Sequence, residues 1–235
     1  MALGIGYNVF AKRTGIDMGL PAEVECNKII DQVIESRRSI RKFRTEAPAR
    51  ELIEQILQAG LMAPYAAAAV SREDFRRFIV IPRESSQTSK VAEILKRKAE
   101  FWSKQLEAQM QTDEFVRQHA GAFLARLKQM AQYGMPNIGK APYYIIVAEQ
   151  RGIPAEEHLS LAHCLQNMWL KAAALGLGMQ LLSITQQLEA DKEFCDLIKI
   201  PMGEFSLDGC LVGYPDMKPP IPKRPSLSQV TEWIE

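Results

Sequence analysis

The sequence has no continuous apolar stretch long enough to cross a membrane. Met1 to Leu20 includes Lys12, Arg13 and Asp17, so it lacks the unbroken apolar core of a signal peptide. An excess of charge of one sign is also missing, because 29 basic and 28 acidic residues leave a net charge of +1. This balance gives no overall field for binding nucleic acid or an anionic membrane. We therefore expect no nucleic-acid partner and no membrane partner.

Cysteine and histidine are also scarce. The four cysteines are scattered without a C-x-x-C pair, which favours small buried side chains over metal ligands or disulfides. This usage predicts a reducing, cytoplasmic location. His158 and His163 are five residues apart on one predicted helix, a spacing that argues against a metal pair. No G-x-S-x-G or H-E-x-x-H motif occurs, so we expect neither a hydrolytic nucleophile nor a metal site.

Apolar periodicity predicts helices and short strands that do not alternate strictly, which favours an α+β fold. The predicted helices span residues 24–36, 49–62, 88–133 (with a break near Thr112 or Gly121), 156–175 and 188–198. The predicted strands span residues 77–81, 143–148, 179–184 and 209–213. We expect an N-terminal arm over residues 1–22 and a single domain over residues 23–235, with a helical insert at about 85–137. The proline-rich segment after Asp216 is expected to be extended and to lie against a partner subunit.

A short run from Glu35 to Phe43 concentrates cations and hydroxyls. Arginine presents a planar fork of donors that matches phosphate oxygens, and a hydroxyl between arginines adds another donor. A second basic pair, Lys223-Arg224, lies between prolines in the tail and is thereby pre-organised for an anion. Two interpretations of the first run stay open: an anion-binding site, or a charged helix end that complements the helix dipole.

The segment Gly176-Leu177-Gly178 precedes the strand predicted at residues 179–184. Its glycines permit a sharp turn and the close approach of another group, and the strand then offers main-chain N–H groups to a flat ligand. A plain helix C-terminus explains the same glycines equally simply.

Five motifs in order, from about Cys26 to Trp233, resemble those of the nitroreductase family of FMN-dependent oxidoreductases. They are Arg37-Arg38-Ser39-Ile40-Arg41-Lys42-Phe43, Arg77-Phe78-Ile79-Val80-Ile81, Ala141-Pro142 with the strand that follows, Gln166-Asn167-Met168 with residues 172–178, and Gly213-Tyr214-Pro215 with the basic tail. The resemblance implies an α-β-α sandwich with a central, mainly antiparallel sheet, in an interlocked homodimer with FMN at the interface. It also implies electron transfer from NAD(P)H through FMN to a small organic acceptor such as a nitroaromatic or a quinone, with no catalytic side chain.

The resemblance assigns three groups of residues to FMN. The first group is expected at the phosphate, the ribityl chain and the pyrimidine edge: Arg37, Arg38, Ser39 and Arg41, with Lys223 and Arg224 reaching the phosphate from the tail. The second group is expected along one face of the isoalloxazine ring: Leu181, Leu182, Ser183 and Ile184. The third group is expected to contact the flavin from the other subunit: Pro64, Tyr65 and Ala66.

The sequence departs from the family pattern after Ala63-Pro64. Family members have Ser or Thr, then Asn and Gln-Pro-Trp, whereas Tyr65 to Arg76 is longer and lacks the Asn. In the tail, Pro222 replaces the family lysine and Lys223 is displaced by one position. The altered loop fits a diverged relative that acts on flavin itself or on halogenated or unsaturated acceptors.

A flavin-binding or storage protein without turnover is a further alternative. The predicted insert is rich in aromatic residues, and it is expected either to roof the substrate pocket or to pack on the dimer surface. Its aromatic residues are Phe101, Trp102, Phe115, Phe123 and Tyr133.

Overall fold

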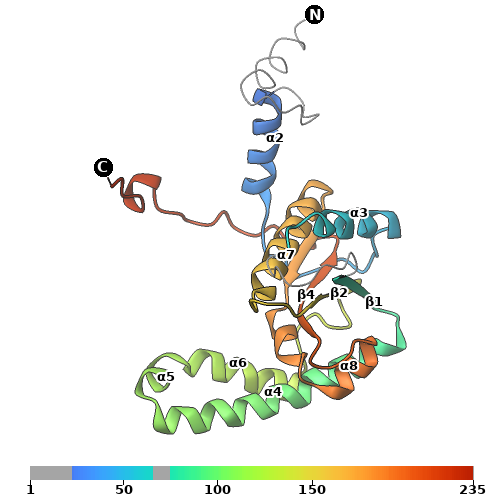
Figure 1. Cartoon of the computed structure of the whole chain (residues 1–235), viewed down its shortest axis with the longest axis vertical. Coiled ribbons are helices and arrows are strands. Elements are labelled where there is room, and N and C mark those ends of the chain that lie inside the picture. Colours follow the sequence, from blue (N-terminus) through green and yellow to red (C-terminus); the bar gives the residue numbers. More distant parts are fainter. Residues whose placement is uncertain (1–22, 66–74, 235) are drawn as a thin grey trace, which may run out of the picture.

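The computed structural model describes residues 23–65 and 75–234. The predicted N-terminal arm and most of the altered loop, Ala66 included, lie outside these residues. The described chain forms a compact body with three extensions, namely the helix α2, a pair of long helices, and the C-terminal tail (Figure 1).

The body is built on one antiparallel sheet with the strand order β1-β2-β4-β3. Its described strands are Arg76–Pro82 (β1), Tyr143–Gln150 (β2), Gly178–Leu181 (β3) and Phe205–Gly213 (β4). Side chains of β2 alternate between the faces, so Ile145 and Val147 pack on one side while Tyr144 and Ile146 pack on the other. The short apolar runs predicted as buried strands therefore lie at the centre of the fold.

Helices cover both faces of the sheet. Helices α3 (Arg50–Leu61) and α7 (Glu157–Ala174) pack on one face through Ile56, Leu161 and Met168. The other face is covered by the start of α4 (Ser86–Thr112), the 3-10 helix η1 (Ser183–Leu188) and α8 (Lys192–Ile198). The result is an α-β-α sandwich, which confirms the α+β fold expected from the sequence.

The stretch over residues 88–133 was expected to break once, but it breaks twice. Helix α4 is followed by α5 (Glu114–His119) and α6 (Gly121–Tyr133). Asp113 causes the first break, because its side chain caps α5 by accepting the Val116 N–H at 3.1 Å. Helices α4 and α6 lie side by side and project from the sandwich (Figure 1). We call α4 to α6 the helical hairpin.

Three other predicted boundaries are wrong. The strand predicted over residues 209–213 already begins at Phe205. The strand predicted over residues 179–184 ends at Leu181, and the chain turns into η1 at Ser183. The helix predicted from Leu188 begins at Lys192, because the Asp191 side chain caps it by accepting the Phe194 N–H at 2.8 Å. No described helix is long and apolar enough to cross a membrane.

Helix α2 (Glu23–Ser36) projects away from the sandwich, and much of its predicted apolar face is exposed. The side chains of Ile29, Ile30 and Ile34 are 53%, 44% and 51% exposed. The chain after Asp216 leaves the body in an extended conformation that includes the short 3-10 helix η2 (Leu227–Gln229). Both extensions carry apolar side chains that the described chain does not bury.

Candidate functional site

Residues 37–43, the basic segment, lie beside β3 at the edge of the sheet. The Ile40 N–H donates to the Met179 carbonyl at 3.0 Å. Beyond the segment, the Arg44 N–H donates to the Tyr214 carbonyl at 2.9 Å, close to the end of β4. These main-chain bonds fix the second half of the segment against the sheet, and they position the side chains between Ile40 and Arg44.

Gly178 makes this close approach possible. A Cβ at Gly178 would lie 2.7 Å from the side chain of Ile40, closer than a real contact allows. Gly176 has a different role, since its φ of +71° belongs to the left-handed turn that follows α7. Gly176 therefore ends a helix, and Gly178 permits the close approach of Ile40 from the same chain.

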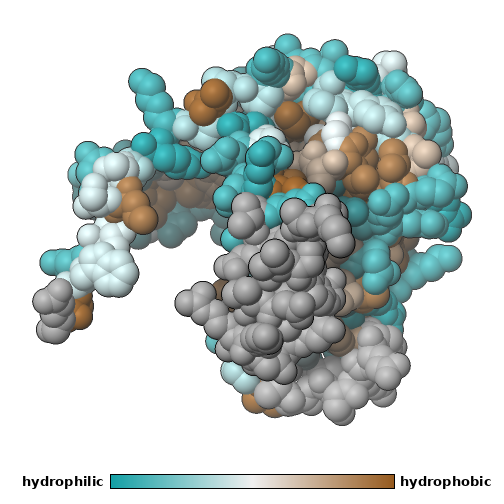
Figure 2. All heavy atoms as spheres, turned by 90° about the horizontal axis from the view of Figure 1, so that it is seen from above, coloured by the Kyte–Doolittle hydropathy of each residue, from teal (hydrophilic) through white to brown (hydrophobic). Residues whose placement is uncertain are grey.

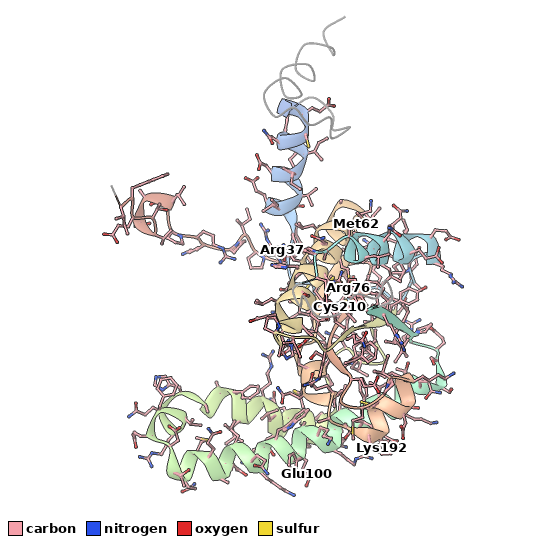
Figure 3. All side chains as sticks on the ribbon, in the orientation of Figure 1. Arg37, Met62, Arg76, Glu100, Lys192 and Cys210 are labelled. Carbon is pink, nitrogen blue, oxygen red and sulfur yellow. The ribbon has the colours of Figure 1, made fainter. Side chains whose placement is uncertain are left out.

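Arg37 and Arg224 approach each other although they are far apart in the sequence. Burial first, then the charges of Arg38 and Arg224, lowers the pKa of Arg37. The Arg37 guanidinium also lies over the ring of Trp169, at 4.3 Å from the centroid. Figure 3 shows Arg37 at the foot of α2, where the tail leaves the body.

No carboxylate in the described part of the chain forms a salt bridge with Arg37, Arg38, Arg41 or Arg224. Cations that lie together without a counter-ion attract an anion from solution. The convergence of the basic segment and the tail therefore forms a candidate anion site.

Arg38 is oriented differently from Arg37. Its guanidinium donates to the carbonyls of Glu35 and Arg37, at the C-terminal end of α2. Its own carbonyl accepts the Trp169 indole N–H at 3.1 Å. Arg38 is therefore oriented as the charged-helix-end interpretation expects, and Arg37 and Arg224 remain the candidates for an anion site. Lys223 is exposed next to Arg224.

A cavity of about 410 Å³, which we call the arginine cavity, opens beside the basic segment. Its walls come from four places: Ser39 and Arg41 of the basic segment, residues 180–184 at the end of β3 and the start of η1, Trp169 of α7, and residues of α6 and the following turn, including Arg126. Leu181 is 41% exposed at this cavity, whereas Leu182 is 1% exposed and packs into the core. Ser183 and Ile184 occupy the first turn of η1, where N–H groups lack a partner within the helix.

The sequence reasoning missed several residues of this cavity, and two of them, Trp169 and Asn137, are informative. Trp169 directly follows the Gln166-Asn167-Met168 motif on α7, and this adjacency was the available signal. Asn137 lies in the turn after the hairpin, where no pattern marks it. Its amide donates to the carbonyl of Arg41 at 3.0 Å and to Gln180 Oε1 at 2.8 Å, so it joins two walls of the cavity.

Pro64 and Tyr65 lie away from this cavity, at the end of α3. The Tyr65 hydroxyl donates to the Gln150 carbonyl at 2.9 Å. The Tyr65 ring lies 4.4 Å from the ring of Phe75, centroid to centroid. The two ends of the altered loop are therefore packed together, and they do not share a site with Ser39 within one chain.

A buried ion pair fixes the start of that loop. Arg76 and Glu149 meet at 2.9 Å with both side chains fully buried. Arg76 also donates to the carbonyls of Gly60 and Ala63, both at 2.9 Å, and so caps the end of α3. Figure 3 shows Arg76 beneath this end of the helix, which Met62 marks. Burial raises the pKa of Glu149, and the bond from Arg76 opposes that shift.

A second cavity of about 410 Å³, which we call the glutamine cavity, adjoins the first. The two share Phe123, Leu127, Ser183 and Ile184. The glutamine cavity lies between the hairpin and η1, and Trp102 also lines it. The other aromatic residues of the hairpin are exposed outside both cavities: Phe101, Phe115 and Tyr133.

The described residues contain no group of three or more His, Cys, Asp or Glu side chains that could hold a metal ion. The four cysteines are free, and burial raises the pKa of Cys164 to about 12. Such thiols stay protonated near neutral pH and are poor nucleophiles.

A family model described as the Nitroreductase family matches residues 34–214 of the chain. A search of curated protein sequences found no significant match. Among solved structures, a nitroreductase with bound FMN from Bacteroides fragilis NCTC 9343 superposes with a TM-score of 0.65 at 17% identity, over 88% of this chain and 98% of that one.

Two further solved structures have the same fold. A BluB-like flavoprotein from Clostridium difficile 630 gives a TM-score of 0.64 at 19% identity, over 88% of this chain and 99% of that one. Oxidised iodotyrosine deiodinase bound to FMN and 3-iodo-L-tyrosine gives a TM-score of 0.61 at 18% identity, over 87% of this chain and 100% of that one. At these identities the likeness shows the fold.

Proposed function

The chain belongs to the nitroreductase family, and from this premise we propose that it is an FMN-dependent oxidoreductase that passes electrons from NAD(P)H to a small organic acceptor. One observation carries the proposal: Arg37 lies over Trp169 of the arginine cavity and close enough to Arg224 for that charge to help lower its pKa, and neither arginine has a described carboxylate partner. A phosphate is the anion that such a pair of guanidinium groups suits best.

The residues present fit FMN. Arg37 and Arg224, with the adjacent Lys223, would hold the phosphate, and Arg38 would contribute its charge next to them. Ser39 and Arg41 line the cavity that continues from this point, so they suit the ribityl chain and the pyrimidine edge. A cation at that edge stabilises the negative charge that a reduced flavin carries. Bound FMN would supply the redox chemistry, namely hydride acceptance from NAD(P)H and delivery of two electrons to the acceptor.

The remaining wall suits a flat ring. Leu181 offers an exposed apolar surface, and Ile184 lines the same cavity from η1. Main-chain N–H groups of Ser183 and Ile184 would donate to the polar edge of the isoalloxazine, and the buried Leu182 supports this turn from the core. The Leu182 N–H itself donates to the Gly209 carbonyl at 2.8 Å, which fixes the start of the turn on β4.

We further propose that the protein works as a homodimer. The isoleucines on α2 and the apolar residues of the tail need cover that the described chain does not provide: Ile221, Leu227, Val230, Trp233 and Ile234, which are 64–96% exposed. Figure 2 shows the tail standing off the body with hydrophobic atoms near its end. A second copy would receive these surfaces, and its Pro64, Tyr65 and Ala66 would reach the flavin of the first. The free cysteines are compatible with the predicted cytoplasmic location.

The absorbance spectrum of the purified protein, incubated with FMN and desalted, tests the proposal. We expect a yellow protein that NADH or NADPH bleaches without oxygen and that a quinone or nitroaromatic compound re-oxidises. A yellow protein inert to both reagents would indicate the flavin-storage alternative. Re-oxidation by a halogenated or unsaturated compound alone, or transformation of the flavin itself, would indicate the diverged relative that the altered loop suggests. A protein that does not retain FMN would contradict all of these functions.

A further inference from the structure

The residues that line the glutamine cavity indicate which electron acceptors would bind there. This inference rests on the proposed function. Four of its side chains are primary amides: Gln105 and Gln109 from α4, and Gln186 and Gln187 from η1. The others are aromatic or aliphatic apart from one hydroxyl: Trp102, Leu106, Phe123, Leu127, Ile184 and Ser183. None of the described residues that line this cavity is charged.

One of the amides has a fixed orientation. Gln186 donates from Nε2 to Asp208 Oδ2 at 2.8 Å, and the Gly209 N–H donates to Asp208 Oδ1 at 2.7 Å. One N–H of the Gln186 amide is thus held by Asp208, which fixes the direction of the amide group. Its carbonyl oxygen is the part of the amide that can accept a bond from a ligand. These two neutral donors hold the Asp208 carboxyl group behind the wall, and it is not part of the cavity lining.

This lining favours some acceptors over others. A charged ligand entering the cavity loses water and finds no opposite charge among the described lining residues, which costs free energy. A carbonyl, amide or hydroxyl group loses less, because primary amides both donate and accept hydrogen bonds. Trp102 and Phe123 add flat apolar surface that suits an aromatic ring.

The cavity is also in the right place. Phe123, Leu127, Ser183 and Ile184 line both cavities, so a ring held against the glutamines borders the position proposed for the isoalloxazine. We propose that the glutamine cavity selects uncharged aromatic acceptors that carry a carbonyl, amide or hydroxyl group, and that it disfavours carboxylates and amino acids. The chain would then differ in specificity from the iodotyrosine deiodinase of the same fold, whose bound 3-iodo-L-tyrosine is an amino acid.

A binding experiment tests the selection without turnover. The FMN-loaded protein is titrated with benzamide and with benzoate, which have nearly the same shape and differ in charge, and tryptophan fluorescence is followed. We expect benzamide to bind at least about tenfold more tightly, a difference of about 1.4 kcal/mol. A Trp102→Phe variant identifies the signal, because it should remove the fluorescence change caused by a ligand in this cavity. Equal affinity for the two ligands, or a signal that persists in that variant, contradicts the proposal.

A pair of charge variants makes the test specific to the cavity. Gln105→Lys places a cation in the lining and should raise benzoate affinity until the preference disappears or reverses. Gln111→Lys makes the same change on the same helix outside both cavities and should leave the preference unchanged. An unchanged preference in Gln105→Lys, or an equal shift in Gln111→Lys, overturns the proposal.

Turnover with 4-nitrobenzamide and 4-nitrobenzoate extends the comparison, and the ratio of their kcat/KM values should follow the binding preference. A ratio near one despite a benzamide preference in binding would mean that the cavity does not select the acceptor, which contradicts the inference. No reduction of any acceptor, together with that preference, would contradict the reductase function and leave the cavity's ligand selectivity supported.

Discussion

The basic segment and the helical hairpin border the same cavity but are fixed in different ways. The basic segment is bonded through its main chain to β3 and to the end of β4, and Ile40 packs directly on Gly178. The hairpin is buried at its base, around Val91 and Ile94, and it projects into solvent beyond that. A wall set by main-chain bonds and close packing tolerates few side-chain changes, whereas a projecting wall tolerates many. The structure thus separates the part that would hold a cofactor from the part that would choose a substrate.

The largest expected effect contrasts an ion pair buried in the sandwich, on which the basic segment is fixed, with an exposed pair on the hairpin. Arg76→Met leaves Glu149 buried without its partner and leaves the carbonyls of Gly60 and Ala63 unpaired, so it should lower the free energy of unfolding by about 3–5 kcal/mol. Lys104→Met in the hairpin breaks an exposed pair that water and salt screen, so it should change the free energy of unfolding far less. Urea unfolding of both variants measures the difference.

A second variant keeps this prediction testable if Arg76→Met does not fold. Arg76→Met combined with Glu149→Leu removes both charges from the core and should recover much of the lost stability. If Arg76→Met and Lys104→Met lower the free energy of unfolding equally, the buried ion pair is no more important for stability than the exposed one.

The next largest effect is expected on the cofactor. Each hydrogen bond to a charged group contributes about 1.5–3 kcal/mol, so replacing both Arg37 and Arg224 by Ala should weaken FMN binding by about 100-fold or more. Lys104→Ala with Arg117→Ala removes the same number of cations from the hairpin and should leave the Kd within about threefold, because exposed charges at a distance are screened. Titration of flavin fluorescence measures both. Comparable losses in the two double variants would assign the effect to overall charge.

A smaller effect is expected from one methyl group placed in each region. Gly178→Ala forces Ile40 and the basic segment away from β3 and should cost about 1–3 kcal/mol, with weaker FMN binding because Ser39 and Arg41 move. Gly121→Ala at the start of α6 meets nothing within 4 Å and should leave the stability unchanged or raise it by up to about 1 kcal/mol. Thermal unfolding and FMN titration report both quantities. A neutral Gly178→Ala would show that the basic segment adjusts freely.

The sequence predicted the sheet and its covering helices because their signals are local. An apolar run such as residues 143–148 marks a buried strand, and a glycine marks the end of a helix. Neighbouring residues alone are enough to predict such elements. Boundaries were missed where a single side chain decides them, as with the caps Asp113 and Asp191. The turn into η1 at Ser183 depends on contacts with β4, which no local pattern contains.

The site was predictable only in part, for the same reason. The basic segment and the tail were each visible, but their meeting depends on the fold. Asn137 and the glutamines of α4 and η1 are ordinary polar residues in sequence, and only their position around a cavity gives them a role. Arg38 shows the converse, because a residue of the basic motif is directed to the helix end.

The smallest expected effect concerns pH, and it has opposite signs at a carboxyl group buried in the sandwich and at one exposed on the hairpin. Burial raises the pKa of Asp208 in the folded protein. The stability linked to its protonated form is fully present below the unfolded pKa of about 4. That stability is lost as the pH rises through the higher folded pKa. Asp208→Asn cannot ionise, so its Tm should fall less than that of the unmodified protein between pH 4 and 7.

In the hairpin, the hydrogen bond and charge of Lys104 lower the pKa of Glu100. The stability that this pair gives the folded protein is present at neutral pH and is lost on acidification. Glu100→Gln should remove that acid-side loss, which is small because the pair is exposed. Thermal unfolding of both variants from pH 3 to 8 gives Tm as a function of pH. If the curve for Asp208→Asn runs parallel to that of the unmodified protein, ionisation of the buried carboxyl group behind Gln186 is not linked to stability.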